Sequence, residues 1–256
     1  MTATTSDGGE WIAKRLARAG LCSRREAERW IEAGRVAVDG RVLTSAALNV
    51  GPEAEITVDG RPLPAAERAR LWRYHKPRGL LCTRHDPQGR KTVFEALPAG
   101  LPRVLTVGRL DLNSEGLLLL TNDGALARRL ESPANGWLRR YRVRAFGHAD
   151  PDRLAALAKG VTIEGVAYGS IDAHIDRDQG HNQWLTLRLR EGKNREIRIV
   201  LDHVGLTVNR LIRTGFGPFQ LGKLEPGAVA EVPPKVLADQ LGTGDDGGWA
   251  RAHRRR

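Results

Sequence analysis

The sequence predicts an α+β protein in which a small N-terminal helical unit precedes a larger domain built on a mainly antiparallel sheet. Three observations support this expectation. Stretches of alternating apolar and polar residues recur along the chain, helical spacing is confined to a few segments, and two stretches turn at Asp-Gly, as two-residue hairpins do. The two parts are expected at residues 10–63 and 71–235, joined by a linker at 64–70.

The small unit begins with two predicted helices. The spacing of Ile12 and Leu16 fits a first helix, which Gly20 ends. Ser23, with Glu26 three residues later, forms a capping-box pattern that opens a second helix. Two hairpins are expected next, because "RVAVDGRVL" and "AEITVDGRPL" alternate as strands do and each turns at Asp-Gly.

The helical half of this unit is strongly basic. Lys14 with Arg18, and Arg25 with Arg29, place like charges four residues apart. Such pairs cost roughly 0.2–0.5 kcal/mol in an isolated helix, so an anionic partner is a reasonable explanation. A solvated helix face is the alternative interpretation. The candidate contacts to an anionic partner are Lys14, Arg18, Arg24, Arg25 and Arg29.

Composition also favours a nucleic-acid partner. The 256 residues carry a formal net charge of +11, and the sequence pI is near 10.4, a common mark of nucleic-acid binding. Cys22 and Cys82 share no metal-ligand spacing, which indicates a reduced, intracellular protein. The polar N-terminus does not resemble a signal peptide, and no apolar run reaches the roughly 18 residues of a membrane span. We therefore expect a cytoplasmic protein, with flexible tails at 1–9 and 236–256.

The larger domain alternates predicted strands with a few helices. "DPDRLAALAKG" predicts a helix with Asp150 as N-cap and Pro151 in the first helical position. "SIDAHID" and "WLTLRLR" alternate as strands do, whereas "NREIRIVLDHVG" returns to helical spacing. Many strands with few helices favour a largely antiparallel sheet.

One aspartate stands at a corner between two apolar runs. In "GRLDLNSEGLLLLTNDG", residues 108–124, Asp111 follows the run 104–107 and precedes the run 117–120. Both runs have the character of buried strands, and the polar span between them is short. A carboxylate at such a corner is held rigidly without being buried. An Asx-turn aspartate that serves only the backbone is the alternative.

Longer motifs resemble two known families. "LARAGLCSRREAERWIEAGRVAVDGRVL" resembles the αL RNA-binding domain, a small module shared by a ribosomal protein and several RNA-modifying enzymes. "HKPRGLLCT", "GRLDLNSEGLLLLTNDG", "RRYRVRAFG", "LREGKNREIRIVLDHVGL" and "NRLIRTGFGPFQLGKLEPG" together resemble the RsuA-type ribosomal RNA pseudouridine synthases. The resemblance covers residues 10 to about 234, including the order of the two domains. It implies isomerisation of one uridine in RNA, without ATP, metal or organic cofactor.

The resemblance also implies roles for individual residues. Asp111 matches the catalytic aspartate, which acts as nucleophile or base near the anomeric carbon of an extruded nucleotide. Tyr141 matches the active-site tyrosine that stacks on the base, and Arg198 matches the basic residue that pairs with the aspartate. We expect the guanidinium of Arg198 within about 2.7–3.2 Å of that carboxylate. Ile199 departs from the pattern, because many relatives have a second basic residue there.

Further basic residues are candidates for contacts to RNA. Arg109 lies next to Asp111, and Lys193 and Arg195 precede Arg198, so we expect these three to line the rim of the same cleft. Lys76 and Pro77 are expected to shape the fold rather than to take part in chemistry. The implied partner is ribosomal RNA, and the protein is expected to act as a monomer. "GKNREIR" followed by "LIRTGFGPFQLG" favours the RluB-like, large-subunit branch.

Two other functions remain open at this point. A catalytically inactive RNA-binding protein of ribosome assembly would share the same modules. A glycoside hydrolase also cleaves at an anomeric carbon, and such enzymes usually need two opposed carboxylates. Asp111, Glu115 and Asp123 could supply two of them, although a basic RNA-binding unit fits a carbohydrate poorly.

Overall fold

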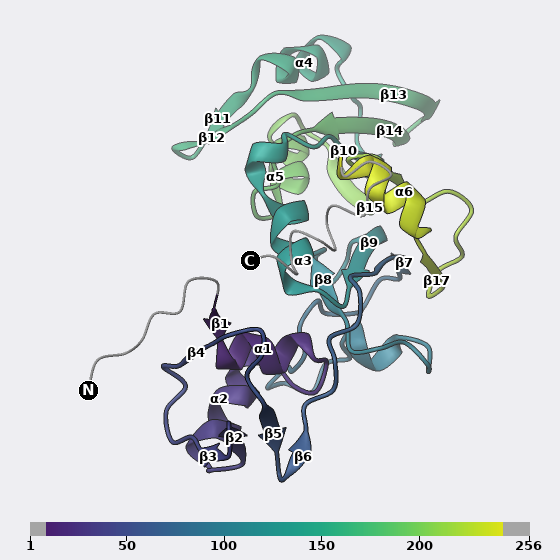
Figure 1. The fold of residues 1–256 in the computed structure, drawn as a ribbon. Helices are drawn as coiled ribbons and strands as arrows, with labels where there is room; N and C mark the ends of the chain where they lie inside the picture. Colours follow the sequence, from purple (N-terminus) through teal and green to yellow (C-terminus); the bar gives the residue numbers. More distant parts are fainter. Residues whose placement is uncertain (1–8, 243–256) are drawn as a thin grey trace.

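The computed structural model describes residues 9–242, without the side chains of residues 177–179 (Figure 1). The expected N-terminal tail, apart from residue 9, and residues 243–256 of the expected C-terminal tail lie outside the described residues. Helices and strands alternate with short connections, and residues 10–62 form a unit with its own sheet.

The N-terminal unit packs two helices on a small sheet. Its elements are β1 (Glu10–Trp11), α1 (Ile12–Arg18), α2 (Arg24–Glu32), β2 (Val36–Val38), β3 (Arg41–Val42), β4 (Asn49–Val50), β5 (Ile56–Val58) and β6 (Arg61–Pro62). The order of the four-stranded sheet is β3-β2-β5-β6, and β1 pairs with β4. Ile12, Leu16 and Ile31 are fully buried in its core, as helical spacing predicts.

The local signals of this unit are confirmed. The Ser23 side chain accepts the backbone N–H of Glu26 at 3.1 Å, and the Glu26 carboxylate accepts the N–H of Ser23 at 3.3 Å. This reciprocal capping box starts α2. Asp39 at φ 49° and Gly40 at φ 77° make the turn between β2 and β3, and the second Asp-Gly pair repeats it between β5 and β6. Positive φ at both turn residues explains the use of Asp-Gly there.

The larger domain is built on a nine-stranded sheet. Its strands are β7 (Leu71–Lys76), β8 (Leu105–Val107), β9 (Glu115–Thr121), β10 (Arg139–Phe146), β13 (Ile171–Gln179), β14 (Asn182–Leu189), β15 (Thr207–Phe216), β16 (Phe219–Gln220) and β17 (Val229–Glu231). The main order is β13-β14-β10-β15-β9-β7-β17, with β8 on β9 and β16 on β15. Among these described strands the pairs are antiparallel, except that β15 runs parallel to β9. The predicted α+β class with a mainly antiparallel sheet is confirmed.

Helices and short hairpins cover this sheet. They are η1 (Phe94–Ala96), α3 (Gly124–Glu131), η2 (Pro133–Asn135), α4 (Pro151–Ala156), η3 (Leu157–Lys159), α5 (Glu196–His203), α6 (Pro234–Gln240), and the hairpin β11 (Val161–Ile163) with β12 (Val166–Tyr168). Asp150 caps α4 by accepting the N–H groups of Asp152 and Arg153, and Pro151 is its first residue, as predicted.

Strand β9 is buried on both faces, which explains its continuous apolar run. Leu117 and Leu119 pack into a core with α3 and α6, while Leu118 and Leu120 pack into another core with residues 80–104. Because successive side chains of a strand point to opposite faces, the segment between the two cores, Leu117–Leu120, is apolar at every position. The strand therefore provides a rigid base for the corner that precedes it.

Helix α6 corrects one expectation. The segment from residue 236 was expected to be a flexible tail, but Pro234–Gln240 form a helix. Leu237 and Leu241 are 8% and 9% exposed and pack into the core beside β9 and α3. Their spacing of four residues places both on one helix face, and the burial of that face stabilises the helix. Pro234 is at the first helical position, where a missing N–H costs nothing.

Candidate active site

The corner that carries Asp111 joins two hydrogen-bonded strands. β8 and β9 pair in antiparallel register, and residues 108–114 connect them. The N–H of Ser114 donates to the carbonyl of Asp111 at 3.0 Å. At the start of the connection, the N–H of Gly108 donates to the carboxylate of Glu131 at 2.6 Å. The connection is therefore held at both ends.

A buried lysine binds the backbone of the same corner. Lys76, at the end of β7, is 0% exposed. Its ammonium donates to the carbonyls of Ser114 at 2.8 Å, Pro77 at 3.0 Å, Asp111 at 3.2 Å and Leu112 at 3.4 Å. Burial lowers the pKa of this lysine. Lys76 therefore has the structural role expected for it, because one charge binds the carbonyls of Asp111 and of two residues that follow it.

The Asp111 side chain opens into a cleft of about 1010 Å³. Within the described chain, the hydrogen bonds of Asp111 are accepted by its backbone carbonyl, so the carboxylate is free of them. Tyr141, Arg109, Lys193 and Arg195 line the same cleft. The structure therefore brings together these five residues from three separate segments of the sequence.

The expected ion pair between Asp111 and Arg198 is absent from the described residues within 4.0 Å. One terminal nitrogen of Arg198 donates to the carbonyl of Asn113 at 3.1 Å, and the other to that of Val208 at 3.0 Å. Burial lowers the pKa of Arg198, as does the charge of Arg195, while Asp111 acts in the opposite direction. The guanidinium thus holds the backbone of the corner instead of the carboxylate, while its Nε is buried without a hydrogen-bond partner among the described residues.

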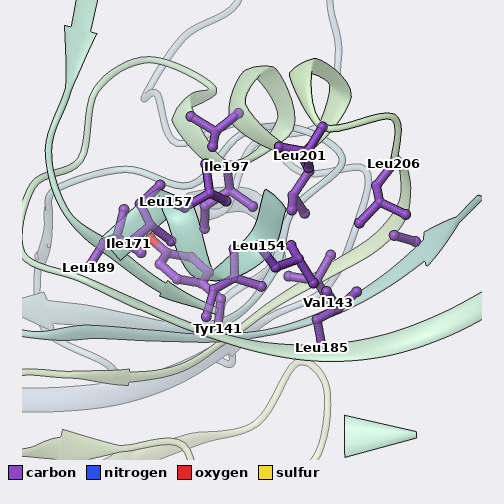
Figure 2. Packing of buried hydrophobic residues seen from close by; sticks show 14 of the residues in the cluster. Tyr141, Val143, Leu154, Leu157, Ile171, Leu185, Leu189, Ile197, Leu201 and Leu206 are labelled. Atoms are coloured by element: carbon purple, nitrogen blue, oxygen red, sulfur yellow. The ribbon is translucent and has the colours of Figure 1, made fainter. Parts of the chain in front are cut away.

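Tyr141 is placed by the centre of the sheet. It lies on β10 opposite Leu187 of β14 and Arg213 of β15, and it is 9% exposed. Figure 2 shows Tyr141 among the buried side chains of one hydrophobic core, with Val143 and Leu185 nearby. The ring is therefore rigid, and it also forms part of the cleft wall. Rigid placement is what a stacking platform for a base requires.

Two arginines of the cleft were not predicted as site residues. The guanidinium carbons of Arg139 and Arg213 each lie 5.2 Å from the ring centroid of Phe216. Arg213 is 4% exposed, its Nε donates to the carbonyl of Leu117 at 2.7 Å, and one terminal nitrogen is buried without a partner. Burial lowers the pKa of Arg139. Both arginines lie within the sequence motifs that resemble the pseudouridine synthases. Their proximity to each other depends on the pairing of β10 with β15.

Two other carboxylates of the corner motif are engaged elsewhere. Glu115 accepts two hydrogen bonds from Arg210, at 2.8 and 3.0 Å. Asp123 caps α3 by accepting the N–H groups of Ala125 and Leu126, each at 2.7 Å. Neither residue lines the cleft that contains Asp111. The pair of opposed carboxylates that a glycoside hydrolase needs is therefore not supplied by these residues.

Comparison with known proteins agrees with this geometry. A family profile described as RNA pseudouridylate synthase matches residues 70–203, more than half of the chain, and an S4 domain profile matches residues 10–56. The chain belongs to the RNA pseudouridine synthase family. An RNA pseudouridine synthase of Rickettsia bellii is 48% identical over 225 residues, which cover 88% of this chain and 97% of that protein.

A second relative in this family carries a more specific name. The ribosomal large subunit pseudouridine synthase B of Salmonella typhi is 45% identical over 220 residues, covering 84% of this chain and 76% of that protein. A crystal structure of a pseudouridylate synthase matches with a TM-score of 0.63 and 23% identity, covering 92% of this chain and 99% of the other. This structural likeness concerns the fold alone.

In the S4 domain, one acid neutralises part of the basic helix. The Glu10 carboxylate lies 2.7 Å from Arg18, 3.3 Å from Lys14 and 3.5 Å from Arg15. The like charges of Lys14 and Arg18 therefore have a partner within the protein, which spacing along one helix did not reveal. Arg25 and Arg29 were also predicted to contact an anionic partner. Within the protein, the Nε of Arg29 donates to the carbonyl of Arg25 at 3.4 Å.

A pair of carboxyl groups organises the loop between β14 and α5. The Glu196 carboxylate accepts the backbone N–H of Lys193 at 2.9 Å, and the negative charge of Glu191 lies nearby. Burial, together with Glu191, raises the pKa of Glu196 to about 7. The ammonium of Lys193 lies 2.6 Å from the Glu191 carboxylate and 2.6 Å from the carbonyl of Ala167. Lys193 is thus partly committed to this loop, while Arg195 has a left-handed backbone at φ 53° and caps α5.

No group of three metal-ligating side chains occurs among the described residues of this family member. In the same part of the chain, no helix is long and apolar enough to cross a membrane.

Proposed function

We propose that the protein isomerises one uridine of ribosomal RNA to pseudouridine, with Asp111 as the nucleophile or base. Family membership supports the reaction class, and the placement of Asp111 with Tyr141 in one cleft carries the assignment of the site. A uridine inside folded RNA is inaccessible, so it must be extruded into such a cleft. The N1–C1′ bond then breaks, the uracil turns, C5 bonds to C1′, and the proton of C5 is lost while N1 gains one.

Each remaining site residue has a physical role in this proposal. Tyr141, held by the core, stacks on the extruded base. Arg198 positions the corner through the carbonyl of Asn113 and adds a positive potential near Asp111. Arg109 and Arg195, both exposed at the cleft, bind the RNA backbone. Lys193 contributes charge at the same rim.

The favoured substrate is large-subunit ribosomal RNA. The name of the Salmonella relative, at 45% identity, supports this choice over the small subunit. The proposal includes a monomeric enzyme acting in the cytoplasm, with the S4 domain as its RNA-binding module. An inactive assembly protein would not need a carboxylate that is held at a rigid corner and left without a partner inside a cleft.

A tritium-release assay tests the function directly. The purified protein is incubated with large- and small-subunit ribosomal RNA transcripts labelled with tritium at C5 of uridine. We expect stoichiometric release from the large-subunit transcript and background release from the small-subunit transcript. Release from the small-subunit RNA alone would reject the substrate choice, and release from neither, including RNA within precursor subunits, would favour the inactive assembly protein.

A further inference from the structure

A second cavity lies between the S4 domain and the catalytic domain. Its volume is about 550 Å³; residues of α1 and the start of α2 form one wall, while residues between 82 and 106 and α3 form the other. Cationic side chains project from both walls, namely Lys14, Arg18, Arg24, Arg84, Arg103 and Arg128.

This interdomain cavity adjoins the catalytic cleft. Cys82, Thr83, Thr106 and Glu131 line both hollows. These shared residues belong to segments before and after the Asp111 corner. The interdomain cavity and the catalytic cleft are therefore adjacent along the surface. A polymer that places one nucleotide beside Asp111 can therefore extend through the second cavity towards the S4 helices.

Two arginines of the catalytic domain form a fixed positive group in this cavity. The guanidinium of Arg84 lies 4.3 Å from the ring centroid of Phe94 and donates to the carbonyl of Val104. Desolvation, together with the charge of Arg103, lowers the pKa of Arg84 to about 10. Arg103 has no ion pair or hydrogen bond of its side chain in the described chain. Two neighbouring cations with no carboxylate between them are stabilised by a bound anion.

The acids near these arginines are already engaged. Asp123 caps α3, and Glu131 accepts the N–H of Gly108. Glu26 attracts Arg84 at longer range, but it is committed to the capping box of α2. Positive charge therefore remains in excess along the cavity, although Glu10 offsets part of it on α1.

We propose that the RNA strand adjoining the target nucleotide crosses this interdomain cavity, where Arg84 and Arg103 bind its backbone phosphates. RNA is the occupant because the cavity is continuous with the nucleotide cleft at one end and with the S4 domain at the other. The contacts are sequence-independent, since phosphate oxygens carry no information on base identity. They position the substrate, while base selection is left to the catalytic cleft. The inference rests on the proposed function only for the identity of the substrate RNA.

The test compares Arg103→Gln, Arg84→Gln and the double variant with a control of equal charge loss. The control is Arg144→Gln with Lys159→Gln, since both residues are exposed and line neither hollow. Binding of a 20-nucleotide oligouridine is measured by filter binding between 50 and 400 mM KCl. Single-stranded RNA gives a slope of log affinity against log salt of about −0.7 per phosphate contact, so each single variant should flatten the slope by about 0.7.

The matching measurement is KM for the large-subunit transcript in the tritium-release assay. We expect the double variant to raise KM at least tenfold and the control to change it less than twofold. Arg103→Gln is decisive because the Arg103 side chain makes no hydrogen bond or ion pair with another described residue. An unchanged slope and KM in Arg103→Gln and the double variant would overturn the proposal. If the wild-type protein released no tritium but the slope still fell, the proposed function would fail while the RNA path stood.

Discussion

Replacing Lys76 by Met should separate the positioning of Asp111 from RNA binding. Methionine keeps much of the length and apolar volume of the side chain but removes the ammonium, which donates to four backbone carbonyls at 2.8–3.4 Å. Leaving a buried carbonyl without its donor costs about 1–3 kcal/mol, so the loss of the ammonium should destabilise the protein by several kcal/mol. Charged hydrogen bonds contribute about 1.5–3 kcal/mol each, but the desolvation of the buried lysine offsets part of that gain.

The catalytic effect should exceed the effect on binding. Once the carbonyls of Ser114 and Pro77 lose their donor, the corner is free to shift, and a misplacement of about 1 Å costs about 100-fold in rate. Single-turnover tritium release should therefore fall by about two orders of magnitude, while the affinity for oligouridine stays within twofold of wild type. Urea unfolding followed by circular dichroism measures the loss of stability.

A matched variant is available on the surface. Lys91 is exposed, and Lys91→Met should change the free energy of unfolding by less than about 0.5 kcal/mol. Should Lys76→Met unfold at the same urea concentration as Lys91→Met and retain full single-turnover rate, the reasoning about the corner is refuted. A loss of RNA affinity without a loss of rate would also contradict it.

Two further predictions concern the same domain. Gly116→Ala should destabilise the protein by about 2–5 kcal/mol in urea unfolding, because its φ is +104° and a Cβ would lie 2.7 Å from the nitrogen of Arg213 and closer still to its oxygen. Gly165→Ala, at φ +80° in open space, should cost only about 1–3 kcal/mol, and equal losses would refute the close-contact argument. The raised pKa of Glu196, about 7, means that its stabilising contribution is full below about pH 4.5 and lost as pH rises through 7. Glu196→Gln, which does not titrate, should flatten the dependence of melting temperature on pH between 5 and 8, and an unchanged profile would contradict the raised pKa of Glu196.

Local signals in the sequence predicted much of the fold. The capping box of Ser23, the Asp-Gly turns and the N-cap of Asp150 were predictable because each depends on residues close in sequence. Helix α6 was missed although Leu237 and Leu241 have helical spacing, because a single apolar pair is a weak signal until its packing partner is known.

The site was only partly predictable for a related reason. Motif resemblance led to Asp111, Tyr141 and the basic residues of the rim, which the structure places in one cleft. It did not show that Arg198 binds the carbonyl of Asn113, because backbone acceptors leave no trace in a residue pattern.

Electrostatic contacts between distant segments could not be predicted from the sequence either. The contacts of Glu10 with three basic side chains, and the meeting of Arg139 with Arg213 over Phe216, depend on the packing of distant segments. Periodicity reports which face of an element is apolar, but it carries no information on which polar groups that face will meet.

The most direct test of the central claim is the single-turnover conversion of uridine by Asp111→Asn. Asparagine has nearly the same shape as aspartate but cannot act as nucleophile or base, and the carboxylate has no hydrogen bond or ion pair with residues 9–242 whose loss would disturb the fold. Exposed Asp202, on α5, provides the matched control, Asp202→Asn. We predict no tritium release above background for Asp111→Asn, with oligouridine affinity and melting temperature close to wild type, and full release for Asp202→Asn. Release by Asp111→Asn at even a few per cent of the wild-type rate would contradict the assignment of Asp111 as the catalytic carboxylate.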